Sequence, residues 1–227
     1  MPPHSTDPVR PDPQEHHVGL VHLDIFSTLD GIAQAPGQPD EDTDGGFPFG
    51  GWQAPLGDGV QGREILAGMQ GMDALLLGRR TYDIFAGYWP QHDGRDVIAD
   101  LFNRIPKYVA SRTPRRLDWA HSVQLDDDVT TAVRAVRDRH EHVHVIGSLD
   151  FAQTLLAAQL VDRLTLWVYP VALGRGKRLW RDGIAPTSFE LVEPALTTPS
   201  GAVLLRYGRL DRPPTTGDMS LPAPGDG

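Results

Sequence analysis

The chain has 227 residues, a net charge of −9 and no cysteine, and these values exclude several classes of protein. The length suits one sizeable α/β domain with a well-buried core. The acidic balance disfavours a nucleic-acid or acidic-membrane surface. The absence of cysteine excludes disulfides, thiol nucleophiles and cysteine-ligated metal centres. No apolar run approaches the roughly 20 residues of a membrane span, and no signal-peptide pattern opens the chain, so we expect a cytoplasmic protein.

Composition divides the chain into three parts. Residues 1–16 are rich in Pro, His and Asp and are expected to form a disordered lead. Residues 17–211 form one continuous domain, and residues 212–227 again have the composition of a disordered tail.

Hydrophobic spacing within this domain predicts alternating strands and helices. The first strand covers residues 18–26 and leads into a long Gly-, Pro- and Asp-rich loop, a length that is often functional. Further strands are expected at 74–77, 106–110, 143–146 and 164–171. Helices are expected at 62–72, directly after Gly78, at 127–140 and at 149–158. The segments 188–196 and 202–207 are expected to form an antiparallel hairpin. The pattern predicts a mostly parallel sheet with an antiparallel edge.

The strand at 74–77 ends at Gly78, and Arg79, Arg80 and Thr81 follow as a helix opens. A strand–glycine–helix turn aims backbone N–H groups and the positive helix end at one point, which suits a phosphate. The alternative is a solvated helix N-terminus with surface arginines, since surface arginine is common.

Two further strand ends repeat this chemistry. The strand at 106–110 is followed by Ser111 and Arg112, and the strand at 143–146 is followed by Gly147 and Ser148. Ligands of open α/β sheets lie outside the carboxyl ends of the strands. If the three strands are parallel neighbours, their ends line one crevice suited to a ligand with several phosphates, as a dinucleotide has.

Other polar and aromatic residues allow two interpretations each. Asp30, beside Gly31, is a candidate for substrate contact or proton relay, or it shapes a turn. Tyr82 is a candidate cofactor contact, although aromatics more often pack in cores. The acidic run at 40–44 is interpreted as a solvated loop face, with a metal or cationic-substrate site as the alternative. The histidines at 140, 142 and 144 put two imidazoles on one strand face, and surface histidines are favoured over a metal site, so no metal is expected.

Taken together, several stretches resemble the dihydrofolate-reductase-like family, in the branch of the C-terminal reductase domain of the bacterial riboflavin-biosynthesis deaminase-reductase. The stretches are STLDG at 27–31, MDALLLGRRTY at 72–82, PKYVASRT at 106–113, VIGS at 145–148, LVDRL at 160–164 and YPVALGRGKRL at 169–179. The resemblance implies a three-layer α/β/α fold with about eight strands and an antiparallel C-terminal edge hairpin.

The same resemblance implies NADPH as cofactor. By position, Gly78, Arg79 and Thr81 meet the cofactor phosphates, and Ser111 and Arg112 hold the 2′-phosphate. Gly147 and Ser148 approach the pyrophosphate closely. The glycines Gly174 and Gly176 lie in a loop that closes over the nicotinamide side. Arg80 belongs to the same basic turn.

The implied activity is that of an NADPH-dependent oxidoreductase. Such an enzyme would be similar to 5-amino-6-(5-phosphoribosylamino)uracil reductase or dihydrofolate reductase. It would act on the C=N or C=O group of a small, pyrimidine- or pterin-like substrate. A non-catalytic NADPH-binding or small-ligand-binding protein on the same fold is the alternative. The apolar run at 164–169 also predicts a homodimer, or else a strand buried between helices.

Overall fold

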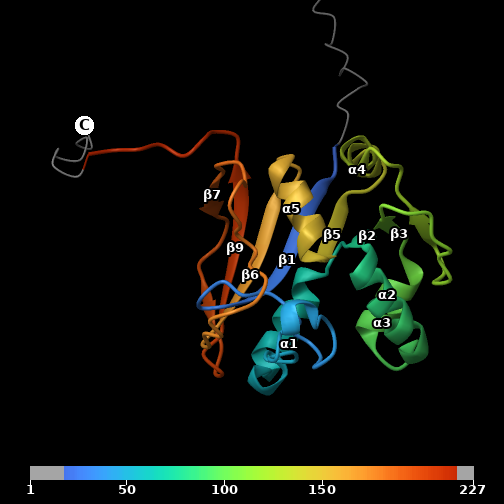
Figure 1. Cartoon of the computed structure of the whole chain (residues 1–227), viewed down its shortest axis with the longest axis horizontal. Coiled ribbons are helices and arrows are strands. Elements are labelled where there is room, and N and C mark those ends of the chain that lie inside the picture. Colours follow the sequence, from blue (N-terminus) through green and yellow to red (C-terminus); the bar gives the residue numbers. More distant parts are fainter. Residues whose placement is uncertain (1–17, 219–227) are drawn as a thin grey trace, which may run out of the picture.

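A computed structural model of the chain describes residues 18–218, which fold around one nine-stranded sheet (Figure 1). The strands are β1 Leu20–Thr28, β2 Ala74–Gly78, β3 Lys107–Ala110, β4 Ser122–Gln124, β5 His142–Gly147, β6 Arg163–Tyr169, β7 Ser188–Leu191, β8 Leu196–Thr197 and β9 Val203–Leu210. Their order is β4-β3-β2-β5-β1-β6-β9-β7, and β8 pairs with β9.

The sheet is parallel from β4 to β6, and β9 then runs antiparallel to β6 and pairs antiparallel with the edge strand β7. The prediction of a mostly parallel sheet with an antiparallel C-terminal hairpin is therefore confirmed, with nine strands in place of about eight. The three strands whose ends carry phosphate donors, β3, β2 and β5, are parallel neighbours, as the crevice hypothesis requires.

Helices cover both faces of the sheet and make three layers. They are α1 Gly59–Gly68, α2 Arg79–Tyr88, α3 Val97–Arg104, α4 Val129–Arg137 and α5 Leu149–Ala157, with short 3₁₀ turns at Asp44–Gly46, Ala54–Leu56 and Trp89–His92. The side chains of α4 and α5 pack with the main core on one face, and those of α1, α2 and α3 pack on the other. In Figure 1, α5 lies in front of β1 and β5.

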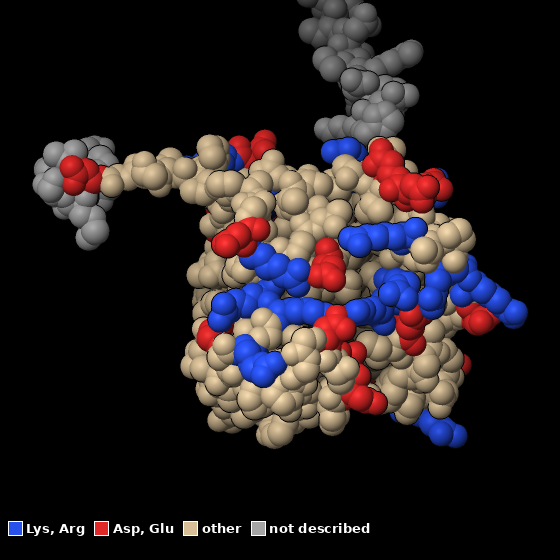
Figure 2. Space-filling view, viewed as in Figure 1, with Lys and Arg blue, Asp and Glu red and all other residues tan. Residues whose placement is uncertain are grey.

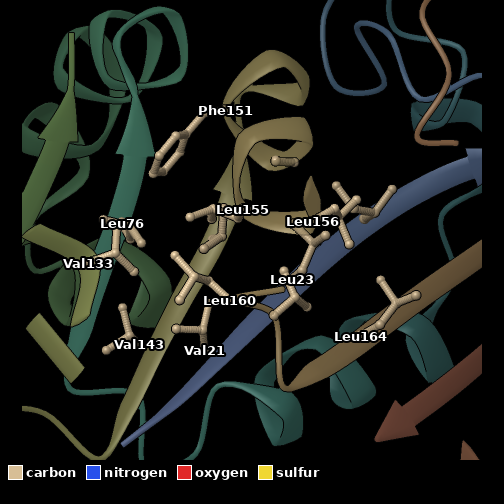
Figure 3. Close-up of a cluster of buried hydrophobic side chains, with 14 of the residues drawn as sticks. Val21, Leu23, Leu76, Val133, Val143, Phe151, Leu155, Leu156, Leu160 and Leu164 are labelled. Atoms are coloured by element: carbon tan, nitrogen blue, oxygen red, sulfur yellow. The ribbon is translucent and has the colours of Figure 1, made fainter. Parts of the chain in front are cut away.

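The main core lies between α4, α5 and the central strands. Figure 3 shows Val21 and Leu23 of β1 turned toward Leu155 and Leu156 of α5. Successive residues of a strand point to opposite faces. The alternate residues of β1, His22, Asp24 and Phe26, therefore face the α1 and α2 side of the sheet.

Several boundaries differ from the sequence expectation. The first helix begins at Gly59 because the Asp58 carboxylate accepts hydrogen bonds from the Val60 and Gln61 backbone N–H groups. Asp128 caps α4 in the same way through Thr131 N–H, so that helix is shorter than predicted. The helix α3 and the three-residue strand β4 were not predicted.

The expected tails lie largely beyond the described residues. The lead at 1–16 lies outside the described range, as does most of the tail at 212–227, so these boundaries stay predictions. Within residues 18–218, no helix has the length and apolar character needed to cross a bilayer. The apolar run of β6 is buried inside its own sheet between β1 and β9, with Leu164, Trp167 and Tyr169 in the core. The homodimer stays a prediction, but this apolar run no longer supports it.

Candidate active site

A cavity of about 480 Å³ opens between the carboxyl half of the central strands and the helices α1 and α2. Its volume falls within the range of small-molecule sites in proteins. The floor comes from β1, β5 and β6, one wall comes from α2 and α3, and the loop at 33–42 forms the rim. Ile84, Phe85, Tyr88, Trp89 and Phe102 make the wall largely apolar.

Two helix N-termini meet at one corner of this cavity. Gly78 at the end of β2 leads into α2, and Gly147 at the end of β5 leads into α5 through Ser148. A Cβ on Gly78 would overlap the Ser148 hydroxyl, and a Cβ on Gly147, whose φ is +155°, would lie 2.5 Å from Thr81 Oγ1. Glycine is therefore required for the two turns to approach, and together they direct N–H groups at the cavity.

The cations at this corner are already paired with acids. Lys177 Nζ lies 2.6 Å from Asp42 Oδ2 and 2.8 Å from Asp44 Oδ2, and Arg80 contacts both carboxylates. Hydrogen bonds from Arg80 and Lys177 lower the pKa of Asp44 to about 2. Asp44 is exposed, as expected of a solvated acidic loop, but the expectation did not include its pairing with these cations or the half-buried position of Asp42.

This pairing is part of a wider pattern on the same face. Figure 2 shows basic side chains gathered in a band across the middle of the molecule, with acidic side chains between them. The loop is also fixed through Gln34, whose amide donates to the carbonyls of Asp42 and Asp44 and accepts from Lys177 N–H. At the rim, the cations Arg80 and Lys177 are therefore matched by Asp42 and Asp44.

The floor of the cavity carries an aspartate and a group of histidines. Asp24 on β1 lines the cavity, and its Oδ2 lies 2.7 Å from His144 Nδ1 on β5. The parallel register sets His22 opposite His144, and the two rings stack at 4.4 Å. His22 Nε2 also lies 3.1 Å from His142 Nδ1.

These histidines differ from the expected surface positions. His142 and His144 do share one strand face, but His144 is only 3% exposed. Burial and the neighbouring His144 lower the pKa of His22 to about 4. Within the described residues no group of His, Asp and Glu is arranged to hold a metal ion.

A second acid enters the cavity from α1. Glu64 Oε2 lies 3.0 Å from Arg206 Nη2 on β9, and Arg206 also pairs with Glu193. The charge of Glu64 is therefore matched by an arginine from the sheet.

The predicted cofactor residues separate into two groups. Arg80, Thr81, Gly147 and Ser148 line the cavity, with Gly78 directly behind them. Arg79 is exposed on the outer side of the turn.

Three further predicted residues lie away from the cavity lining. Ser111 and Arg112 follow β3, where Ser111 Oγ donates to the Thr113 carbonyl and Arg112 is exposed. Tyr82 is 3% exposed and its hydroxyl accepts from Trp119 N–H, so its expected cofactor contact is corrected to a core position. Tyr82 faces the core because it lies on the side of α2 that packs against β2 and β3.

Asp30 serves the loop after β6. Its carboxylate accepts from Thr28 Oγ1 at 2.6 Å, from Gly174 N at 2.8 Å and from Leu173 N at 3.2 Å. The Thr28 hydrogen bond is the main cause that lowers the pKa of Asp30. Asp30 does not line the cavity, and this geometry matches the turn-shaping alternative.

The glycines of that loop have structural reasons of their own. Gly174 has a φ of +75° and offers its N–H to Asp30. Gly176 packs so closely on Ile32 and Phe47 that a Cβ would lie 2.7 Å from the Ile32 side chain. Both hold the loop that carries Lys177, and neither lines the main cavity.

Sequence reasoning missed Asp24, Lys177 and the β6 residues Thr165 and Trp167, all of which line the cavity. The alternation of polar and apolar residues along a strand could have identified Asp24. A polar residue between apolar neighbours, as Asp24 is between Leu23 and Ile25, indicates a face turned away from the main core.

The fold and the site together define a dihydrofolate-reductase-like α/β protein. A dihydrofolate reductase from Enterococcus faecalis, solved with NADP(H), superposes with a TM-score of 0.54 at 12% identity over 85% of this chain and 98% of that one. A pyrimidine reductase-like protein from Corynebacterium diphtheriae superposes with a TM-score of 0.55 at 17% identity, covering 86% of this chain and 93% of that one. At these identities the likeness shows the fold.

The family follows from the sequence match. The family model for the RibD C-terminal domain matches residues 20–200, and the chain belongs to this family. The uncharacterized protein YyaP of Bacillus subtilis (strain 168) is 27% identical over 140 residues, which are 60% of this chain and 73% of YyaP. Family membership supports a reductase of the riboflavin-biosynthesis type.

Proposed function

We propose that this protein is an NADPH-dependent reductase that transfers hydride to a C=N or C=O group of a small, pyrimidine- or pterin-like substrate. The observation that carries the proposal is the meeting of the α2 and α5 N-termini at the glycine turns Gly78 and Gly147, on the edge of a mostly apolar cavity. Membership of the RibD C-terminal domain family supports the same class of reaction.

The residues at this corner fit the diphosphate of a dinucleotide. The helices α2 and α5 begin at this corner, and the two glycines let their first turns pack together where a Cβ would overlap Ser148 or Thr81. Arg80 and Lys177 add positive charge. Bound NADPH supplies the hydride, and the protein supplies position and charge.

The two cations have to exchange partners when a phosphate binds. Asp42 and Asp44 now hold Arg80 and Lys177, and a phosphate competes with these carboxylates for the same donors. The acids of the loop at 37–47 therefore compete with an anionic ligand for Arg80 and Lys177.

Discrimination between NADPH and NADH is assigned to the end of β3. Ser111 and Arg112 lie beside the end of β2, and within residues 18–218 Arg112 has no ion-pair partner. A forked guanidinium of this kind suits the additional 2′-phosphate.

The first test compares cofactor affinities by the fluorescence of the bound nicotinamide. Arg112→Ala should weaken NADPH by about tenfold to a hundredfold, the loss of one charge-assisted contact, and leave NADH unchanged. Arg116→Ala is the matched control, since Arg116 is exposed on the same segment and pairs only with Asp118. Equal affinity of the parent protein for both cofactors would contradict the NADPH assignment.

The second test follows the oxidation of NADPH by absorbance with a panel of pterins, aminopyrimidines, cyclic imines and carbonyl compounds. Steady, enzyme-dependent oxidation with any of them supports the reductase. Tight NADPH binding without turnover across the panel would favour the non-catalytic alternative.

A further inference from the structure

The carboxylates that line the cavity differ in how their charges are matched. Asp42 is paired with Lys177 and Arg80, Glu64 with Arg206, and Asp150 with Arg181 at 2.8 Å. Each of these acids therefore has a permanent cation beside it.

Two lining carboxylates have no Lys or Arg partner within residues 18–218. Glu41 sits on the rim and accepts hydrogen bonds from the backbone N–H groups of Gly37 and Gln38. Asp24 sits on the floor, and its ionisable partner is His144. The Asp24 side chain is 28% exposed, so its carboxylate is open to the cavity, whereas His144 behind it is buried.

Among the described residues around Asp24, no Lys or Arg forms an ion pair with its carboxylate. On the strands, His22 stacks on His144, Arg163 lies across from His22, and Arg206 is committed to Glu64 and Glu193. From the helices, Glu64 of α1 adds negative charge that Arg206 already matches. On α2, Arg80 is held by Asp42 and Asp44, and Tyr88 lines the apolar wall.

The protonation states follow from burial and contacts. Burial raises the pKa of Asp24, but the charge and hydrogen bond of His144, with a hydrogen bond from Thr165, outweigh it and lower the pKa below the ordinary value. The depressed pKa of His22 keeps that ring neutral near pH 7. The floor therefore presents a carboxylate anion at neutral pH.

We propose that Asp24 is the specificity-determining residue of this cavity, which binds a positively charged or N–H-bearing group of the substrate, and that His144 is its positioning residue. The proposal rests on the proposed reductase function. One oxygen of the carboxylate already faces His144, and a carboxylate that is open to the cavity can accept further charge-assisted N–H···O contacts from a ligand.

The role of Asp24 distinguishes the two reacting groups of the proposed function, C=N and C=O. In the reduction of a protonated C=N group, hydride forms the new C–H bond and the C=N π pair becomes the nitrogen lone pair, so the positive charge is discharged without a further proton. Asp24 stabilises that cation as it binds. In the reduction of a neutral C=O group negative charge grows on oxygen, and an adjacent carboxylate opposes it. The cavity therefore favours protonated C=N substrates.

The test uses benzamidine, a planar cation, and benzamide, its neutral analogue of nearly the same shape. Affinities are measured by calorimetry, and by quenching of tryptophan fluorescence, since Trp89 and Trp167 line the cavity. The parent protein should bind benzamidine at least about tenfold more tightly than benzamide. Equal affinities, or a preference for benzamide, would overturn the proposal without any variant.

Asp24→Asn keeps the size of the side chain and removes its charge. It should abolish the preference for benzamidine and leave benzamide binding unchanged. Glu41→Gln is the matched control, because Glu41 is the other lining acid without a Lys or Arg partner, and it should retain the preference. Loss of the preference in Glu41→Gln but not in Asp24→Asn would assign the role to the rim.

The role of His144 has a separate signature in pH. His144→Phe preserves a ring to stack on His22 and removes the hydrogen bond to Asp24. Burial then raises the pKa of Asp24, so benzamidine affinity should begin to fall at a higher pH in this variant than in the parent as the pH is lowered. An equal loss for both probes at every pH would show a structural role only.

Cofactor binding separates this proposal from the proposed function. If NADPH neither binds nor is oxidised while Asp24→Asn still removes the benzamidine preference, the reductase function fails, but the cation-binding role of Asp24 stands. If NADPH binds but charge preference does not depend on Asp24, the cofactor assignment stands and this inference fails.

Discussion

Asp24 and Asp30 lie on the same segment of chain, six residues apart, but their carboxylates have different surroundings. Asp30 follows the strand, and the hydroxyl of Thr28 and the N–H groups of Leu173 and Gly174 complete its carboxylate. Asp24 lies within the strand, faces the cavity and has the buried His144 behind it. A carboxylate completed by its own protein shapes a loop, whereas one left open to a cavity is available to a ligand.

The largest expected difference between the two aspartates is in turnover. With a protonated C=N substrate, Asp24→Asn should reduce kcat/KM by on the order of a hundredfold, because a charge-assisted contact to the reacting group is lost. Asp30→Asn should change it by less than about threefold. Steady-state NADPH oxidation measures both. A hundredfold loss in Asp30→Asn with a near-parental Asp24→Asn would reverse the comparison and restore Asp30 as the catalytic candidate.

The histidine stack behind Asp24 predicts how the fold responds to acid. The folded pKa of His22 is about 4, below its unfolded value of 6.5, so the unfolded state binds protons more readily in this window. The stability from a neutral His22 is complete above pH 6.5 and is lost as pH falls toward 4, a change of about 1 to 3 kcal/mol. His22→Phe keeps a stacked ring and removes this titration. Urea unfolding at several pH values should show a shallower decline of the unfolding free energy for His22→Phe, and parallel declines would contradict the lowered pKa of His22.

For stability we expect the opposite order, with a larger loss of unfolding free energy in Asp30→Asn than in Asp24→Asn. Asp30→Asn weakens the hydrogen bonds that hold residues 173–174 and should lower the unfolding free energy by about 1 kcal/mol. Asp24→Asn loses the contact of the charged carboxylate with His144, but the burial that opposes this charge partly offsets the loss, so the unfolding free energy should change less than in Asp30→Asn. Chemical denaturation of both variants at pH 7 checks this. A clear loss in Asp24→Asn alone would mean that the Asp24–His144 contact serves the fold.

How far the sequence predicts these features depends on how local they are. The turns at Gly78 and Gly147 follow from strand, glycine and helix patterns in one short stretch, and both were predicted with their elements. The contact between Asp24 and His144 depends on the register of β1 and β5, which are far apart along the chain. The pairing of Arg80 with Asp44 depends on the path of a long loop. The three residues of β4 are too few to show any period.

The smallest expected effect concerns the acids on the rim. Asp44→Asn removes one competitor for Arg80 and Lys177, so NADPH should bind more tightly, by up to about fivefold for exposed ion pairs of this kind. The gain should shrink as salt is added, because exposed pairs are screened. A titration at two ionic strengths measures it. Weaker NADPH binding in Asp44→Asn would show that the closed loop supports the cofactor.

The central claim is that the N-termini of α2 and α5 hold the phosphates of NADPH. Titration of ¹⁵N-labelled protein with NADPH, followed by amide NMR, tests it most directly. The account predicts saturable shifts that are largest for the amides of Arg79, Arg80 and Thr81 and for Ser148 and Leu149, with small shifts in the β7–β9 hairpin. Saturable binding that leaves these five amides in place, or no binding at all, would contradict it.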